Sequence, residues 1–181
     1  VLGVILGLVA SGGFVQATGK QVSFYWYNQD YRMTYRVIRQ LFLLGLKAMS
    51  LLFLVVTIVN SFVRLYPFTF VAITFAYALL IGSLLLALAP LYTIKKRWMI
   101  SIAVLVGTAV TLCLHWFTSI STYLVHWSGI LVSILISGIY IYWFFKIKIR
   151  ENKDVSEQVP RTALAIYRNI NYFVYGTLIY V

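Results

Sequence analysis

The chain has 181 residues, of which 62% are hydrophobic and 10% are charged, and its formal net charge is +11 at pH 7. A soluble domain is about 45–50% apolar and about 25% charged, so these figures exclude a soluble globular fold. Lipid is the expected solvent. An excess of 15 Lys and Arg over 4 Asp and Glu is also typical of nucleic-acid binding when it covers a polar surface, so the positions of the charges decide its meaning.

Six apolar segments are long enough for membrane-spanning helices or are cut short at a chain end. A bilayer core about 30 Å thick requires roughly 20 apolar residues in a helix, and in lipid each span must satisfy its own backbone groups. In chain order the predicted spans are 1–19, 41–63, 68–94, 98–117, 123–145 and a last one that begins near Ile170. We therefore predict an all-α fold, a polytopic bundle of transmembrane helices.

The basic residues are concentrated in alternate connections between these spans. The first, third and fifth connections, with Lys47 just inside the second span, hold five, three and six of the 15 Lys and Arg residues, and only Arg64 lies elsewhere. The positive-inside rule makes these connections cytoplasmic. The sequence thus predicts a multi-pass protein of the inner (cytoplasmic) membrane. The charge marks topology, and nucleic acid is not an expected partner.

Both ends of the sequence lie in apolar segments, which affects the expected domain organisation. The chain opens on Val1 without an initiator Met, so we expect a piece of a longer protein; a signal peptide cleaved before Val1 is the other explanation. Counted from a cytoplasmic start, the six spans are the second to seventh of about 12. Residues 1–145 would then form most of a first half, 146–168 a cytoplasmic linker, and 169–181 the start of a second half, as in transporters built from repeats.

A basic stripe precedes the second predicted span and continues into it. Its members, at helical spacing, are Arg32, Arg36, Arg39 and Lys47. Aromatic and aliphatic residues occupy another side, so the first part of this segment is expected to lie in the headgroup layer. In one interpretation the arginines bind anionic headgroups and the lysine extends to the interface. In the other, the stripe is the cationic wall of a central substrate-binding cavity.

Polar and small residues interrupt two predicted spans. Ser11, Gly12, Gly13 and Gln16 make a polar, flexible patch in the first span. Because glycine destabilises a helix by about 1 kcal/mol relative to alanine, the patch indicates a gating bend, a cavity lining or ordinary close packing. Asn60, near the outer end of the second span, is a further cavity candidate; a hydrogen bond to another helix is the alternative.

Small residues recur at every fourth position in three spans. The three sets are Gly3, Gly7 and Ser11; Ala103, Gly107 and Thr111; and Gly129, Ser133 and Ser137. Lipid provides no hydrophobic drive for helix association, so close packing through small residues must supply it. The pattern predicts helices packed into a bundle.

The residue types that catalysis or metal binding requires are not grouped in the sequence. Cys113 is the only cysteine, and all four acidic residues fall in predicted cytoplasmic connections. His115 and His126 flank one outer connection, where an interfacial position and a proton relay are both open. We therefore predict no enzyme activity, no catalytic residue, no metal site and no cofactor.

Several of these features together resemble a family of transporters. They are Ser11-Gly12-Gly13-Phe14, Tyr31-Arg32-Met33-Thr34-Tyr35-Arg36, the fifth span with its small residues, the charged linker, and Tyr167-Arg168-Asn169-Ile170-Asn171-Tyr172. The combination resembles the first half of flippases of the multidrug, oligosaccharidyl-lipid and polysaccharide exporter superfamily. Within it, the polysaccharide-exporter branch and its Pel-type exopolysaccharide transporters are the most similar.

The resemblance implies a protein of two pseudo-symmetric halves that moves polysaccharide or lipid-linked glycan across the cytoplasmic membrane by alternating access. It implies the bilayer, a glycan substrate, and a glycosyltransferase or other export-complex subunits as partners. The basic stripe matches the family's habit of a basic cavity. The alternative function is a non-transporting integral membrane subunit or sensor scaffold, whose cytoplasmic linker contacts a partner.

Overall fold

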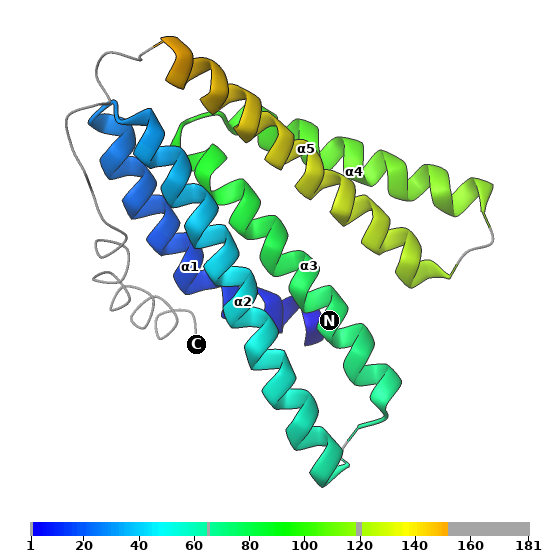
Figure 1. Cartoon of the computed structure of the whole chain (residues 1–181). Helices are drawn as coiled ribbons and strands as arrows, with labels where there is room; N and C mark the ends of the chain where they lie inside the picture. Colours follow the sequence, from blue (N-terminus) through cyan, green and yellow to red (C-terminus); the bar gives the residue numbers. More distant parts are fainter. Residues whose placement is uncertain (1, 65, 119–120, 152–181) are drawn as a thin grey trace.

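The computed structural model describes residues 2–64, 66–118 and 121–151, and these form five helices that run alternately up and down (Figure 1). The helices are α1 (Leu2–Tyr27), α2 (Tyr31–Val63), α3 (Phe68–Thr93), α4 (Arg97–Phe117) and α5 (Thr122–Glu151). The described ranges contain no β-strand. The predicted all-α bundle is confirmed.

All five helices are long and apolar enough to cross a membrane. At 1.5 Å per residue, the 21 residues of α4 extend about 31 Å and the 33 residues of α2 about 50 Å, against a hydrocarbon core of about 30 Å. Large apolar side chains such as Leu51, Leu105 and Leu135 are at least 60% exposed along the helices, where only lipid or further protein can cover them. The chain is an integral membrane protein with several membrane-spanning helices.

The first connection is much shorter than the sequence predicts. α1 continues eight residues past the predicted end of the first span, and only residues 28–30 separate it from α2. Asp30 then begins α2 as its N-cap, because its Oδ1 accepts a hydrogen bond of 3.0 Å from the backbone N–H of Met33. Residues 20–27 and 31–40 are therefore parts of two long helices.

The expectation that the basic stripe begins on a helix lying in the headgroup layer is wrong. α2 is one continuous helix of 33 residues. Its first turns stand inside the bundle because Met33, Thr34 and Val37 are buried. The apolar side of this segment thus packs on protein, whereas a helix lying on the membrane would bury that side in lipid.

The basic residues sort to one end of the bundle. We call this the basic end: it contains the turns 28–30 and 94–96 and the C-terminal end of α5, which lie at the top in Figure 1. Lys95, Lys96 and Arg97 are found there, together with Lys146. Arg64 caps the C-terminus of α2 at the opposite end. This separation is the arrangement that the alternation of basic connections predicts.

Two groups of buried apolar residues hold the helices together. The basic-end cluster draws on all five helices and consists of Val22, Tyr25, Met33, Val37, Ile38, Leu41, Leu91, Ile94, Met99, Ile141 and Phe145. The second cluster joins only α1, α2 and α3 and consists of Phe14, Met49, Phe53, Ala78 and Leu86. α4 and α5 therefore meet the three-helix unit mainly at the basic end.

The α4–α5 pair is held by the small residues that the sequence singled out. A Cβ added at Gly107 would lie 2.5 Å from the backbone oxygen of Gly129, and one added at Gly129 would lie 2.6 Å from the oxygen of Gly107. Ser133 Oγ donates a hydrogen bond of 2.9 Å to the carbonyl oxygen of Ala103 across the same contact. The packing prediction for these two small-residue sets is confirmed.

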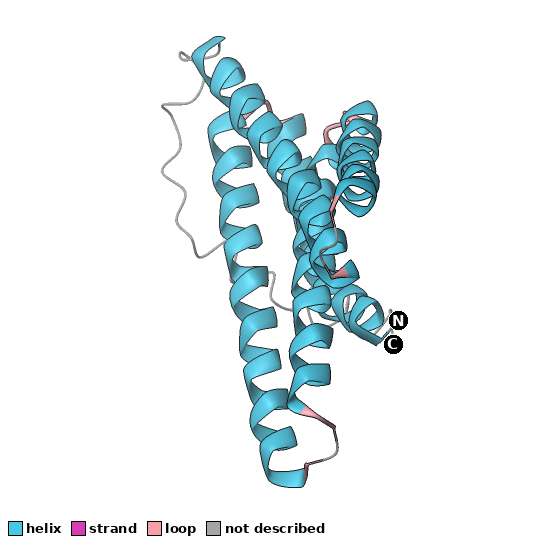
Figure 2. Ribbon diagram, turned by 90° about the vertical axis from the view of Figure 1, so that its right-hand side faces the viewer, coloured by secondary structure: helices cyan, strands magenta, loops and turns pink. Residues whose placement is uncertain are grey.

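The remaining predicted segments fall mostly outside the described residues. The sixth span near Ile170 and residues 152–168 of the predicted linker lie there, so neither the linker nor a second half is described. Residues 146–151 are described, and they continue α5 as helix rather than starting a loop. Figure 2 shows α5 extending in this way past the ends of its neighbours.

Candidate functional site

The basic stripe lies on the exposed side of α2. Arg32, Arg36, Arg39 and Lys47 are all exposed. The buried residues of α2 follow the opposite side, through Met33, Thr34, Val37, Ile38, Leu41, Gly45, Met49 and Phe53. The helical periodicity of apolar residues therefore orients the four cations away from the core. No Asp or Glu of the described residues pairs with them.

Lys47 occupies an unusual depth for an exposed cation. It is the middle residue of α2, with 16 residues on each side. Measured from residue 41, where the apolar run of this helix begins, it lies six residues or about 9 Å farther along the helix axis. A charge on a lipid-facing helix surface is costly at such a depth unless the side chain reaches the interface or a polar cavity.

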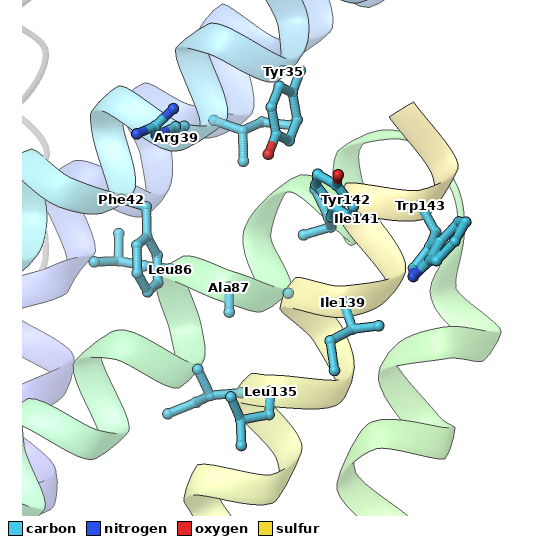
Figure 3. Close-up of a pocket in the computed structure, with 13 residues that line it drawn as sticks. Tyr35, Arg39, Phe42, Leu86, Ala87, Leu135, Ile139, Ile141, Tyr142 and Trp143 are labelled. Atoms are coloured by element: carbon cyan, nitrogen blue, oxygen red, sulfur yellow. The ribbon is translucent and has the colours of Figure 1, made fainter. Parts of the chain in front are cut away.

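A cavity of about 440 Å³ lies between α2, α3 and α5. Figure 3 shows its lining: Tyr35, Arg39 and Phe42 come from α2, Leu86 and Ala87 from α3, and Leu135, Ile139, Ile141, Tyr142 and Trp143 from α5. The volume is within the roughly 300–1,000 Å³ range of small-molecule sites. Of the four stripe residues, only Arg39 lines it, since it sits at the border between the exposed and packed sides of α2.

The polar groups of this cavity are all near the basic end. Arg39 and the phenol of Tyr35 belong to the first turns of α2, and Tyr142 and Trp143 belong to the last turns of α5. Lys146 lies just beyond, with its Nζ 5.7 Å and 5.1 Å from the ring centroids of Tyr142 and Trp143. Arg39 therefore lines one end of an otherwise apolar cavity, and Lys146 lies one turn of α5 beyond the lining residues Tyr142 and Trp143.

The polar patch of the first span lies inside the bundle and does not line this cavity. Ser11, Gly12 and Gly13 are buried, and Gln16 is half-buried. α1 is helical through all four positions, and Ser11 Oγ bonds back to the carbonyl of Leu8 at 3.4 Å. None of these four residues lines the cavity, and α1 has no break at them. Their burial favours the interpretation of ordinary close helix packing.

Asn60 serves the turn between α2 and α3. Its Nδ2 donates to the carbonyl oxygen of Tyr66, and its Oδ1 accepts from the N–H of Tyr66, both at 3.0 Å. The side chain thus replaces two backbone hydrogen bonds that the turn lacks. It is distant from the cavity lining and bonds a loop rather than another helix.

A contact that sequence reasoning did not identify joins α3 to α5 away from the basic end. Tyr77 Oη lies 3.2 Å from His126 Nδ1, and the Tyr77 ring contacts Tyr123 and Trp127 edge-on at centroid distances of 6.4 and 5.9 Å. The sequence contained a signal in the repeated His-Trp pairs, but no spacing rule could select tyrosine 77 as the partner. His126 therefore lies near the end of α5 and also contacts a neighbouring helix, α3.

The sequence pattern also did not predict the cavity, although the position of Gly138 could have indicated it. The small residues at 129, 133 and 137 form one side of α5, and Gly138 is adjacent to that side without belonging to it. A Cβ added at Gly138 meets nothing within 4 Å. This glycine thus opens the cavity instead of packing a helix contact.

Comparison with known proteins gives no match: neither a protein-family model, nor a curated protein sequence, nor a solved structure is similar to this chain. Among the described residues, no three His, Cys, Asp or Glu side chains are grouped as a metal ion would require. What the fold defines is a multi-pass helical membrane protein with a cationic stripe and an adjoining cavity.

Proposed function

We propose that this protein is a membrane transporter that moves polysaccharide or lipid-linked glycan across the cytoplasmic membrane by alternating access, with the basic end in the cytoplasm. The observation that carries the proposal is the position of Lys47, exposed at the middle of α2 on the side away from the bundle. The resemblance to polysaccharide flippases supports the choice of substrate.

The energetic argument concerns the surroundings of Lys47. A lysine at the centre of the bilayer costs about 2.5–3.5 kcal/mol. Lys47 lies about 9 Å inside the apolar run of α2 and bears part of that cost unless its ammonium reaches the interface or a polar cavity. A water-filled cavity between this side of α2 and a complementary part of the protein removes that cost and gives the ammonium a ligand. Arg32, Arg36 and Arg39 continue the charge over about 23 Å of helix towards the basic end. A polar or anionic glycan could move along such a wall through successive charge-assisted hydrogen bonds.

The uneven packing of the bundle supports alternating access. All five helices share the basic-end cluster, whereas α4 and α5 contribute no residue to the second cluster. Away from the basic end, Tyr77 of α3 contacts His126, Tyr123 and Trp127 of α5. Weakly packed regions open at the lowest free energy. The pair can therefore turn about the basic end while the three-helix unit stays intact.

The proposed partners follow from the same reasoning. They are the bilayer, a glycosyltransferase that supplies the glycan, and other subunits of an export complex in the inner membrane. Enzyme activity, a cofactor and nucleic-acid binding are not part of the proposal. The second candidate function is a non-transporting subunit or sensor scaffold. The helix α4 favours it, because only Met99, Ala103 and Gly107 of its 21 residues are buried and most of the others are exposed and could contact a partner.

Substitution of Lys47 tests the proposal. Polysaccharide export by cells carrying Lys47→Leu should fall about tenfold or more, since a charge-assisted hydrogen bond contributes about 1.5–3 kcal/mol. Lys47→Arg should retain most of the export because it keeps the charge. Arg64→Leu, which removes a cation at the opposite end, is the matched control, and immunoblots of membranes verify equal insertion. Full export by the Lys47→Leu variant would support the interpretation that the stripe binds lipid headgroups and would refute the proposal that Lys47 binds the transported glycan.

A further inference from the structure

The cavity between α2, α3 and α5 is chemically divided along its length. Its end near the basic end is lined by Arg39 and by Tyr35, Tyr142 and Trp143, aromatic residues with a polar tip. Farther from that end, the lining is aliphatic and aromatic: Phe42, Leu86, Ile134, Leu135 and Ile139. Tyrosine and tryptophan favour the boundary between headgroups and hydrocarbon, because each has an apolar body and a polar tip.

The charged end has no anion of its own. Arg39 and Lys146 lack an ion-pair partner among the described residues, and the one ion pair there joins Lys148 to Glu151. A guanidinium matches a phosphate group with parallel N–H donors, and a lysine adds a point charge. A ligand for this end therefore needs a negative group at the level of the headgroups.

The cavity is open towards the bilayer on the α5 side. Leu135 is 60% exposed and Ile139 is 57% exposed although both line it. Gly138, between them in sequence, leaves free space where any other residue would place a side chain. An apolar chain can therefore enter sideways from the lipid and lie along α5.

We infer that this cavity binds an anionic phospholipid of the surrounding bilayer, with its phosphate between Arg39 and Lys146 and part of an acyl chain along Phe42, Leu86 and Leu135. The bilayer that surrounds the helices supplies molecules of this kind, because its lipids combine a charged headgroup with a long apolar chain. The inference does not require the transport proposed above, although Arg39 takes part in both: the lipid would contact Arg39 on the cavity side of α2, whereas the transported glycan would lie along the Lys47 side.

Thermal denaturation of the purified protein in detergent tests this inference. Phosphatidylglycerol and phosphatidylcholine with identical acyl chains are titrated separately, and the rise in denaturation midpoint reports binding to the folded state. Phosphatidylglycerol should bind at least about tenfold more tightly. Arg39→Gln should weaken it by about tenfold, as expected for a lost charge-assisted hydrogen bond, and Lys146→Gln should weaken it in the same direction. Arg64→Gln is the control cation and should leave it unchanged.

Gly138→Leu tests the location of the lipid because it fills the cavity and leaves every cation in place. It should abolish the preference for phosphatidylglycerol. An unchanged preference in Gly138→Leu, or equal stabilisation of the unaltered protein by the two lipids, would overturn the inference. If Gly138→Leu fails to fold, the Arg39→Gln and Lys146→Gln titrations decide alone, and binding that is insensitive to both refutes the site.

Discussion

Replacing Gly129 with alanine should destabilise the protein far more than the size of one methyl group implies. The added Cβ would lie 2.6 Å from the carbonyl oxygen of Gly107 and would also clash with Thr111 Oγ1. Ordinary contacts of a Cβ begin near 3.4 Å, so α4 and α5 must separate by about 0.8 Å. A gap of 0.5–1 Å already forfeits a quarter to a half of the van der Waals attraction across a contact.

The magnitude follows from what holds α4 in place. Its only buried residues are Met99, Ala103 and Gly107, so no other tightly packed surface compensates. Overpacking costs about 1–3 kcal/mol. The hydrogen bond from Ser133 to Ala103 would lengthen beyond bonding distance, which adds about 0.6 kcal/mol, the average for such bonds in membranes. We expect the free energy of unfolding to fall by about 2–4 kcal/mol.

Unfolding in mixed micelles of a mild detergent and dodecyl sulfate measures this difference. Gly138→Ala is the matched control, because it makes the same chemical change in the same helix at a position with nothing within 4 Å of the new Cβ. That variant should be as stable as the parent or slightly more so, since alanine favours helix over glycine. If the two variants differ by less than about 0.5 kcal/mol, the close approach of α4 and α5 is not what stabilises the pair.

Three further outcomes are expected. Asp30→Ala should lower the free energy of unfolding by about 1 kcal/mol, since α2 loses its N-cap, while Asp30→Asn should retain most of it; equal losses in both would contradict a capping role. Tyr77→Phe should remove the polar link to α5, so that spin labels at the ends of α3 and α5 away from the basic end show a broader distance distribution than in the parent. In a Cys113→Ser background, Tyr66→Cys should react with an impermeant maleimide added to intact cells and Asn28→Cys should react only after lysis, and the reverse pattern would invert the proposed orientation.

The sequence alone determined the solvent, the fold class and the sorting of charge. Runs of about 20 apolar residues leave a helix as the simplest way to satisfy the backbone in lipid. At the ends away from the basic end, the predicted limits of α2, α3, α4 and α5 agree with the structure to within one residue. The fourth-residue spacing of Gly107 and Gly129 with their neighbours also predicted close packing, because period alone places such residues on one side of a helix.

Only the tertiary structure decided where α1 ends, how α2 stands and which cation reaches a cavity. Gln21 and Thr34 are polar and lie outside the predicted spans, yet both are buried, because neighbouring helices cover them at the basic end. Hydropathy describes the preference of each side chain for lipid over water. It contains no information about which helix packs beside that side chain. For the same reason the pattern grouped Arg39 with Lys47 on one stripe, whereas the packing of α3 and α5 against α2 separates them: Arg39 lines the cavity, and Lys47 does not.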